Sequence, residues 1–215
     1  DEDLTPIAWL WTNSIKSPSP AHSDLYTPLL KSRILQKKKG NDVWIGINSE
    51  SNEMNITINQ GKTPEDIEAY TVSKSGGSTC IYSNSPIPFD YIRKESKEGR
   101  MKAELFAVVL EGKKERVFLE PPEGLLTCLP EEEIELAFSG NIQGKAKVNI
   151  GLYGFEKFDQ LYNNRQALAI RTFSDILQEL ADELVQKTDD YEYTIAIKTY
   201  LAFAINRGAD RWSKF

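Results

Sequence analysis

The residues GGSTCIYSNSPIP at 76–88 have the spacing of a metal-binding knuckle in which one ligand is missing. Cys80 is followed by Ser83 at the position where a second cysteine would complete a C-x-x-C pair. A second loose pair, Ser17 and His22, lies upstream in SPSPAH. A serine hydroxyl is not ionised at neutral pH and is a poor zinc ligand, so only His22 and Cys80 are competent. Because a structural zinc needs four ligands, these residues predict no native metal site.

Side chains that perform catalysis in enzymes show no recognisable arrangement in this sequence. It has no Gly-x-Gly-x-x-Gly turn, no P-loop and no Gly-x-Ser-x-Gly elbow. A serine or cysteine nucleophile would have one candidate base, because His22 is the only histidine. The single Pro-Pro turn, at 120–123, lacks the aromatic residue of the Asn/Asp-Pro-Pro-Tyr/Phe loop that holds a flipped base. We therefore expect no catalytic residue and no cofactor site in this chain.

The composition is that of a soluble globular protein. Of the 215 residues, 40% are hydrophobic and 27% are charged. No apolar run approaches the roughly 18–20 residues of a membrane helix, and the acidic start DEDLTPIAWLW has no secretory n-region. Cys80 and Cys128 make a poor disulfide framework, which favours a cytoplasmic location. We expect no membrane association.

The charge is negative overall but unevenly distributed. A net charge of −6 argues against a freestanding nucleic-acid binder. Basic residues nevertheless concentrate in KSRILQKKK at 31–39 and again from residue 93 onward, and acidic residues gather at 131–135. A solvated hairpin turn is the alternative interpretation of the lysine run, since a charge run alone is weak evidence of binding.

The pattern of apolar residues changes along the chain and predicts an α+β fold. Up to about residue 150 the period is that of strands, with hairpins predicted over 43–60 and 101–122 and a short helix over 63–70. The segment 121–147 resembles an exposed connection. We therefore divide the chain into a β-rich region, 1–150, and a helical region, 151–215.

The helical region contains two predicted helices. Apolar residues recur at three- and four-residue spacing from Leu161 to Val185, which predicts an amphipathic helix ending near Lys187. A second helix is expected from a cap at Thr188 or Asp189 to about Arg207–Gly208. It is apolar nearly all round, so we expect it to be buried against something large.

Three stretches carry a family resemblance: SPIPFDYIRKESKEGRMKAELFAVVLEGKKERVFL (85–119), TPIAWLWTNSIKSP (5–18) and GLYGFEKFDQLYNNRQALAIRTFSDIL (151–177). Together they resemble a family of DNA methylases, of the adenine-specific type, that contain an internal zinc-ribbon module. The closing TYLAFAINRGADRWS (199–213) is similar to the family's helix before its catalytic loop. The resemblance is co-linear from about residue 5 to residue 213. Members are large S-adenosylmethionine-dependent methyltransferases, often linked to phage defence.

The resemblance implies an origin for the incomplete knuckle. In the family, a Cys-Pro-x-x-x-Cys type knuckle follows the aliphatic-Trp opening, and a Thr-Cys-x-x-Cys knuckle precedes the Pro-Ile-Pro segment. Those four places are here Ser17, His22, Cys80 and Ser83. The resemblance therefore implies a degenerate zinc-ribbon-like module, over about 14–30 and 76–90, that hairpin packing holds together without metal.

The same resemblance implies a function. The family's cofactor motif would precede residue 1 and its catalytic loop would follow residue 215, so this chain would be a non-catalytic internal segment of a DNA methyltransferase. One expected role is DNA engagement, through the phosphate-contact and stacking candidates Lys37, Lys38, Lys39, Tyr91, Arg93, Arg100 and Lys102. The alternative is a scaffold for partner proteins of a defence complex, without direct nucleic-acid contact.

Overall fold

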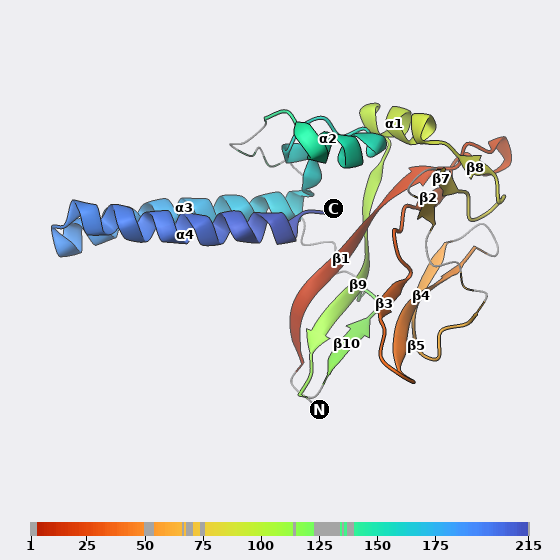
Figure 1. The fold of residues 1–215 in the computed structure, drawn as a ribbon, viewed down its shortest axis with the longest axis horizontal. Helices are drawn as coiled ribbons and strands as arrows, with labels where there is room; N and C mark the ends of the chain where they lie inside the picture. Colours follow the sequence, from red (N-terminus) through yellow and green to blue (C-terminus); the bar gives the residue numbers. More distant parts are fainter. Residues whose placement is uncertain are drawn as a thin grey trace. The chain divides into compact units, whose positions relative to one another are not determined.

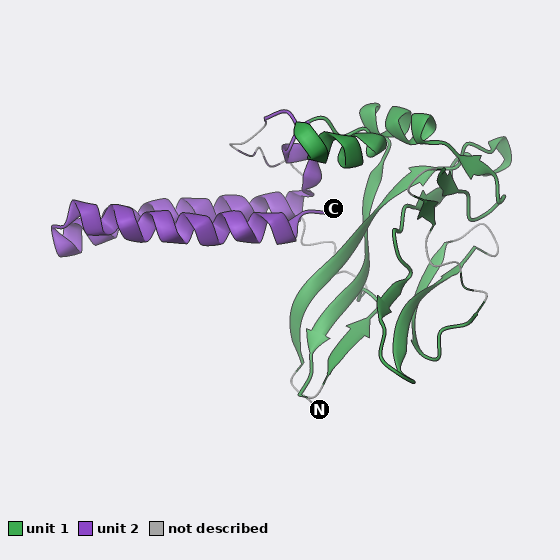
Figure 2. Cartoon of the chain, viewed as in Figure 1, with its two compact units in different colours: residues 1–125, 143–156 green, residues 126–142, 157–215 purple. Residues whose placement is uncertain are grey.

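The computed structural model describes residues 4–49, 54–65, 67, 71–73, 76–113, 115–122, 134, 136 and 140–214. The chain forms two compact units (Figure 2): residues 1–125 with 143–156, and residues 126–142 with 157–215. As predicted, the fold is α+β. The named strands all lie in the first unit, and a pair of long helices closes the second (Figure 1).

The main sheet of the first unit is built on one long antiparallel pair, β1 (Thr5–Lys16) with β9 (Lys102–Glu111). Its strand order is β10-β9-β1-β2, with β10 at Arg116–Leu119 and β2 at Tyr26–Pro28. The hairpin of β9 and β10 confirms the prediction over 101–122. The apolar run of β9 is continuous because the strand contributes buried side chains to two separate clusters, which cover both of its faces.

A second sheet packs on one of those clusters. It contains β3 (Ile34–Gln36), β4 (Asp42–Asn48) and β5 (Asn55–Gly61), in that order. The register of β4 and β5 runs from the Asp42–Gly61 pair to the Asn48–Asn55 pair, which confirms the predicted hairpin. Ile45 of β4 and Phe106 of β9 belong to the same buried cluster, so this cluster joins the two sheets.

The remaining elements of the first unit are short. Strands β6 (Val72–Ser73), β7 (Gly77–Thr79) and β8 (Pro86–Ile87) form a third sheet. Helix α1 (Phe89–Lys97) begins directly after Pro88, and α2 (Gly144–Ile150) leads into a 3-10 turn, η4, at Gly151–Tyr153.

The exposed connection expected over 121–147 is wrong at its end, because residues 144–147 belong to α2, which begins at Gly144, whose φ of 61° lies in the left-handed region. Half of the short helix predicted over 63–70, residues 66 and 68–70, lies outside the described residues, and residues 63–65 and 67 are not helical.

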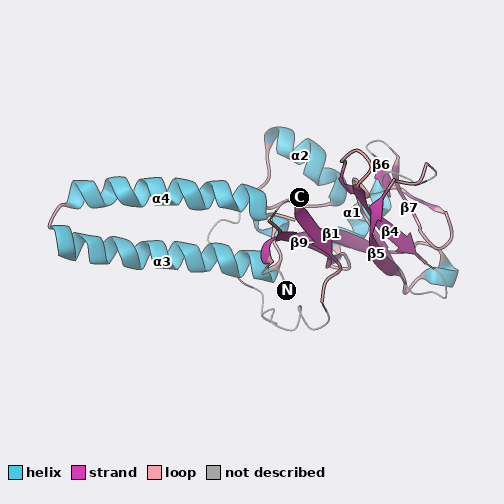
Figure 3. Ribbon diagram, turned by 90° about the horizontal axis from the view of Figure 1, so that it is seen from below, coloured by secondary structure: helices cyan, strands magenta, loops and turns pink. Residues whose placement is uncertain are grey.

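The second unit is dominated by a helical hairpin, α3 (Asn164–Thr188) and α4 (Tyr191–Trp212), which lie side by side (Figure 3). A capping box fixes the start of α3, because Asn163 and Gln166 each accept a hydrogen bond from the backbone N–H of the other. The end of α3 one residue after Lys187 confirms the prediction.

The boundaries of α4 differ from those predicted. The N-cap is Asp190, whose carboxylate accepts from the backbone N–H of Tyr193 at 2.9 Å, and not Thr188 or Asp189. The helix also continues past Gly208 to Trp212. Gly208 makes room for the Trp212 ring, since a Cβ there would lie 2.7 Å from it. The glycine therefore permits packing within the helix and does not end it.

The expected burial of α4 is wrong for this chain. Thr194 is the only buried residue of the helix. Tyr200 is 74% exposed and Phe203 is 63% exposed. A two-helix hairpin covers only one side of each helix, so an apolar helix in it keeps most of its surface exposed.

Two glycines with similar backbone angles test the packing of the third sheet. Gly77 (φ 83°) and Gly40 (φ 78°) both lie in the left-handed region, but only a Cβ at Gly77 would overlap the carbonyl oxygen of Ile87. We expect Gly40→Ala to lower the free energy of unfolding by about 1–2 kcal/mol for the strained backbone. Gly77→Ala should cost about 1–3 kcal/mol more for the overlap. Urea denaturation followed by tryptophan fluorescence measures both, and equal losses would contradict the steric argument.

Candidate functional site

The two segments of the incomplete knuckle are the loops of two β-hairpins. The first loop joins β1 to β2, and the backbone N–H of Ser17 donates to the carbonyl of Leu25 across its base at 2.9 Å. The second loop joins β7 to β8. There the N–H of Cys80 donates to the Ser85 carbonyl, and the N–H of Asn84 donates to the Cys80 carbonyl, each at 2.9 Å. Each loop therefore presents its first residue from a position fixed by strand pairing.

The two loops meet at their first residues. The Ser17 hydroxyl lies 3.1 Å from the Cys80 thiol, and both side chains are buried. Ser83 follows Cys80 by three residues in the second loop, and its side chain helps to lower the pKa of the thiol. The His22 ring stacks on the ring of Tyr82, with centroids 5.8 Å apart and planes 16° apart. Ser17 and Cys80 thus touch directly across the two loops, and His22 stacks on Tyr82, the residue before Ser83. We call these four residues and Tyr82 the loop cluster.

The hydrogen bonds in the loop cluster set the ionisation of the thiol. Burial raises the pKa of Cys80, but hydrogen bonds from the side chains of Ser17 and Ser83 and from nearby backbone amides outweigh it. The net pKa lies below the ordinary value for a cysteine. The pKa of Tyr82 is raised, first by burial and then by the neighbouring Cys80.

The loop cluster does not fit a structural zinc as it stands. Its competent donors are the Cys80 thiol and the His22 imidazole, and the other two positions offer neutral hydroxyls. No group of three or more His, Cys, Asp or Glu side chains with metal-binding geometry occurs in the part of the chain that the structure describes. One polar atom is unusual: His22 Nδ1 is buried and has no hydrogen-bond partner among those residues.

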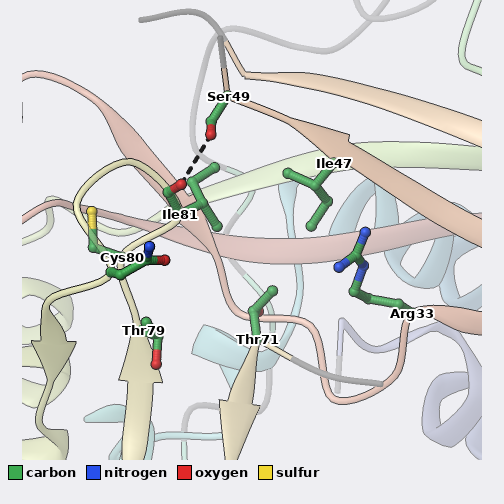
Figure 4. A pocket seen from close by; sticks show the side chains of 8 residues that line it. Arg33, Ile47, Ser49, Thr71, Thr79, Cys80 and Ile81 are labelled. Atoms are coloured by element: carbon green, nitrogen blue, oxygen red, sulfur yellow. Dashed lines mark hydrogen bonds between the residues drawn. The ribbon is translucent and has the colours of Figure 1, made fainter. Parts of the chain in front are cut away.

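A small polar cavity of about 150 Å³ opens beside Cys80 (Figure 4). Its wall combines hydroxyl, amide and guanidinium groups with two isoleucines: Arg33, Ile47, Ser49, Thr71, Thr79, Cys80, Ile81 and Asn84. The Ser49 hydroxyl donates to the Ile81 carbonyl at 2.9 Å, so part of this polar surface is already satisfied. The volume suits a few water molecules better than a substrate.

Several candidate DNA contacts are engaged with acidic residues. The guanidinium of Arg100 donates two hydrogen bonds, of 2.9 and 2.6 Å, to the Glu95 carboxylate and forms an ion pair with Glu98. Glu95 is only 3% exposed, so Arg100 neutralises a buried carboxylate. Arg93 pairs with Asp90 on the same helix. This geometry gives Arg100 a structural role.

The other candidates differ in how they are held. Lys38 pairs with Glu115 at 2.7 Å and lowers the pKa of that carboxyl, and Lys102 lies 4.1 Å from the centre of the Tyr26 ring. Tyr91 is half-buried. Lys37 and Lys39 are exposed in the turn between β3 and β4, and neither forms an ion pair with any described residue. A DNA-contact role for all seven candidates stays a prediction.

Some sequence features cannot be placed, and others were missed. Cys128 and the acidic stretch at 131–135 lie outside the described residues, apart from the position of Ile134. Tyr82 was missed as the stacking partner of His22, although its place inside the second loop was a usable signal.

Comparison with protein-family models, with curated proteins and with solved structures finds no match to this chain. Among the described helices, none is long and apolar enough to cross a membrane.

The Arg100–Glu95 pair yields a test of its structural role. Arg100→Ala should lower the thermal midpoint by about 5 °C or more, because it leaves a buried carboxylate without its cation. Adding Glu95→Gln should recover part of the loss, since the uncompensated charge is then removed. Lys94→Ala, an exposed change on α1 beside Glu95, is the control. Arg100→Ala and Lys94→Ala variants with the same midpoint would show that the pair is not structural.

Proposed function

We propose that this chain is a non-catalytic internal segment of an S-adenosylmethionine-dependent DNA methyltransferase. The parent enzyme would act in the cytoplasm, in phage defence. The observation that supports this proposal is the meeting of Ser17, Cys80 and Ser83, with His22 stacked beside them. The methylase resemblance assigns these positions to two zinc knuckles, and it does so from sequence alone.

The meeting is informative because the sequence gives no other reason for it. Ser17 and Cys80 are far apart in the chain, and serine is a common residue in loops. If the loop from β7 to β8 were an ordinary turn that contains a cysteine, no second loop would need to lie within hydrogen-bond distance of the thiol. In a zinc ribbon, two hairpin loops must approach so that four side chains face one point. The loop cluster keeps that approach and replaces metal bonds with hydrogen bonds to the Cys80 thiol.

Restoring the missing ligands tests the proposal. The Ser17→Cys/Ser83→Cys variant, with Cys80 and His22, should bind about one Co²⁺ or Zn²⁺ per chain. Bound Co²⁺ should show the absorption of tetrahedral thiolate coordination, and Zn²⁺ should raise the thermal midpoint because binding energy adds to folding energy. The matched control is Ser19→Cys/Ser85→Cys, which adds two thiols to the same loops at positions outside the cluster.

Two outcomes would contradict the proposal. In one, the restored variant folds but binds metal no better than the control. In the other, His22→Ala in the restored variant leaves the Co²⁺ spectrum unchanged. Either result would mean that the loop cluster does not have the geometry of a ribbon site.

DNA engagement is the role we propose for the segment within the parent enzyme. The exposed turn with Lys37 and Lys39 supports it best, because Arg100, Arg93 and Lys38 already neutralise acidic side chains. Exposed lysines in a turn between two paired strands can act as point charges toward phosphates. S-adenosylmethionine and catalysis would belong to other parts of the parent enzyme.

A scaffold for partner proteins is the second candidate, and a separate observation favours it. Large apolar side chains remain exposed along α3 and α4, among them Phe173, Ile176 and Tyr200. Contiguous apolar surface of this kind marks protein interaction sites more often than DNA sites.

A salt titration separates the two roles. A phosphate-contacting segment should bind a DNA duplex with an affinity that falls steeply as salt rises, and Lys37→Ala/Lys39→Ala should flatten the log–log slope by about two units. Lys145→Ala/Lys147→Ala, which removes the same charge from α2, is the control. Absence of binding at low salt, or an equal effect of the control variant, would favour the scaffold role.

A further inference from the structure

The helical hairpin has two unlike sides, and the helical period defines them. At about 100° per residue, the inward line of α3 passes through its buried residues Ala167, Ile170 and Ala181. About 90° behind that line runs a stripe of five apolar residues at coiled-coil spacing: Phe173, Ile176, Leu177, Leu180 and Leu184. None of these five side chains is buried.

A matching stripe lies on α4. Its inward line passes through Thr194, Ile205 and Trp212. About 90° behind it lie Tyr193, Ile197, Tyr200 and Ala204, again at four- and three-residue spacing. Because the helices are antiparallel, their rotation senses are opposite, and two stripes that both lie behind the inward line fall on the same side of the hairpin. We call the nine residues of the two stripes the apolar side.

The opposite side is mostly polar, and a hydrogen bond between the helices fixes its position. Lys198 of α4 donates to the Gln178 side chain of α3 at 2.6 Å. Both residues lie ahead of their inward lines. Gln178 also donates to Asp182 at 3.3 Å on this side. Two apolar side chains of α4 lie here as well, Tyr191 and Ile195. The hairpin is therefore amphipathic as a unit.

The apolar side has the area of one half of a dimer interface. An aromatic side chain offers about 150–250 Å², so Phe173, Tyr193 and Tyr200, which are 48%, 53% and 74% exposed, leave about 350 Å² uncovered. The aliphatic side chains of the stripes bring the total to about 600 Å². A homodimer interface of standard size buries about 800 Å² per partner, of which about 65% is apolar. The exposed apolar area of the apolar side is therefore close to the apolar area that one partner contributes to such an interface.

Arg211, which is exposed, continues the line of the α4 stripe at its end, and the two other basic residues at the rim are paired within the hairpin. Lys187 pairs with Glu183 at 3.0 Å, and Arg207 pairs with Asp210 at 3.2 Å. The nine residues of the apolar side carry no charge. A surface that meets its own copy about a two-fold axis must avoid like charges facing each other, and this surface meets that condition.

We propose that the apolar side binds the same side of a second copy of this chain, so that two hairpins form a four-helix bundle. Such bundles bury a core of a and d positions between helix pairs, which is the pattern that both stripes show. Leu180 and Tyr200 lie in the middle of their stripes and form the centre of the interface. The inference is independent of the methylase assignment, because it uses only the hairpin.

The test is the mass of the full chain in sedimentation velocity over a range of concentrations. The unchanged chain should sediment as a dimer and dissociate on dilution. Leu180→Glu/Tyr200→Glu should shift the dissociation midpoint by at least about tenfold in concentration. Gln186→Glu/Ala202→Glu, which adds the same charge at exposed positions away from the apolar side, should leave the midpoint unchanged.

Two further measurements cover the case in which the double glutamate variant loses its helices. Far-ultraviolet circular dichroism shows whether α3 and α4 persist, and the milder Leu180→Ala/Tyr200→Ala variant should still weaken the dimer. A single-chain mass at every concentration overturns the proposal, and a different protein or segment then covers the apolar side. A dimer that survives both changes to the apolar side also overturns it.

Discussion

The pairing of β1 with β9 is the constraint on which the rest of the first unit depends. It holds residues 5–14 against residues 102–111, and every other sheet element is attached to one of these two strands or to the cluster beneath them. A bulge at Phe106 turns that side chain and Ala107 into the same cluster, which joins the main sheet to the sheet of β4 and β5. The end of β1 then delivers Ser17 to the loop cluster.

Charge in the first unit is used for packing as much as for solvation. Glu95 points inward from α1 and is tolerated because Arg100 closes over it with two hydrogen bonds. Lys38 and Glu115 join the β3–β4 turn to the β9–β10 turn. A basic cluster in a sequence therefore says little about binding until the acidic partners of each residue are known.

Regular elements could be predicted from the sequence because their signals are local. The hairpins around β4, β5, β9 and β10 and the end of α3 follow from side-chain period and turn residues. The end of α4 could not be predicted, because Gly208 serves the packing of Trp212, a tertiary contact. The loop cluster is intermediate. Its members could be named from sequence, but the 3.1 Å contact between Ser17 and Cys80 depends on long-range strand pairing.

The long-range closure of the first unit has a consequence for the order of folding. Strand β1 is synthesised before the second and third sheets and its partner β9 only after them, and residues 143–156 also belong to this unit. Pairings so distant in sequence are slow to form, because loop closure precedes any gain in contacts. The α3–α4 hairpin needs only a two-residue connection and can form within itself. During synthesis, β1 must therefore remain unpaired until residues 17–101 have been added, and its Trp-rich segment is the part most exposed to premature association.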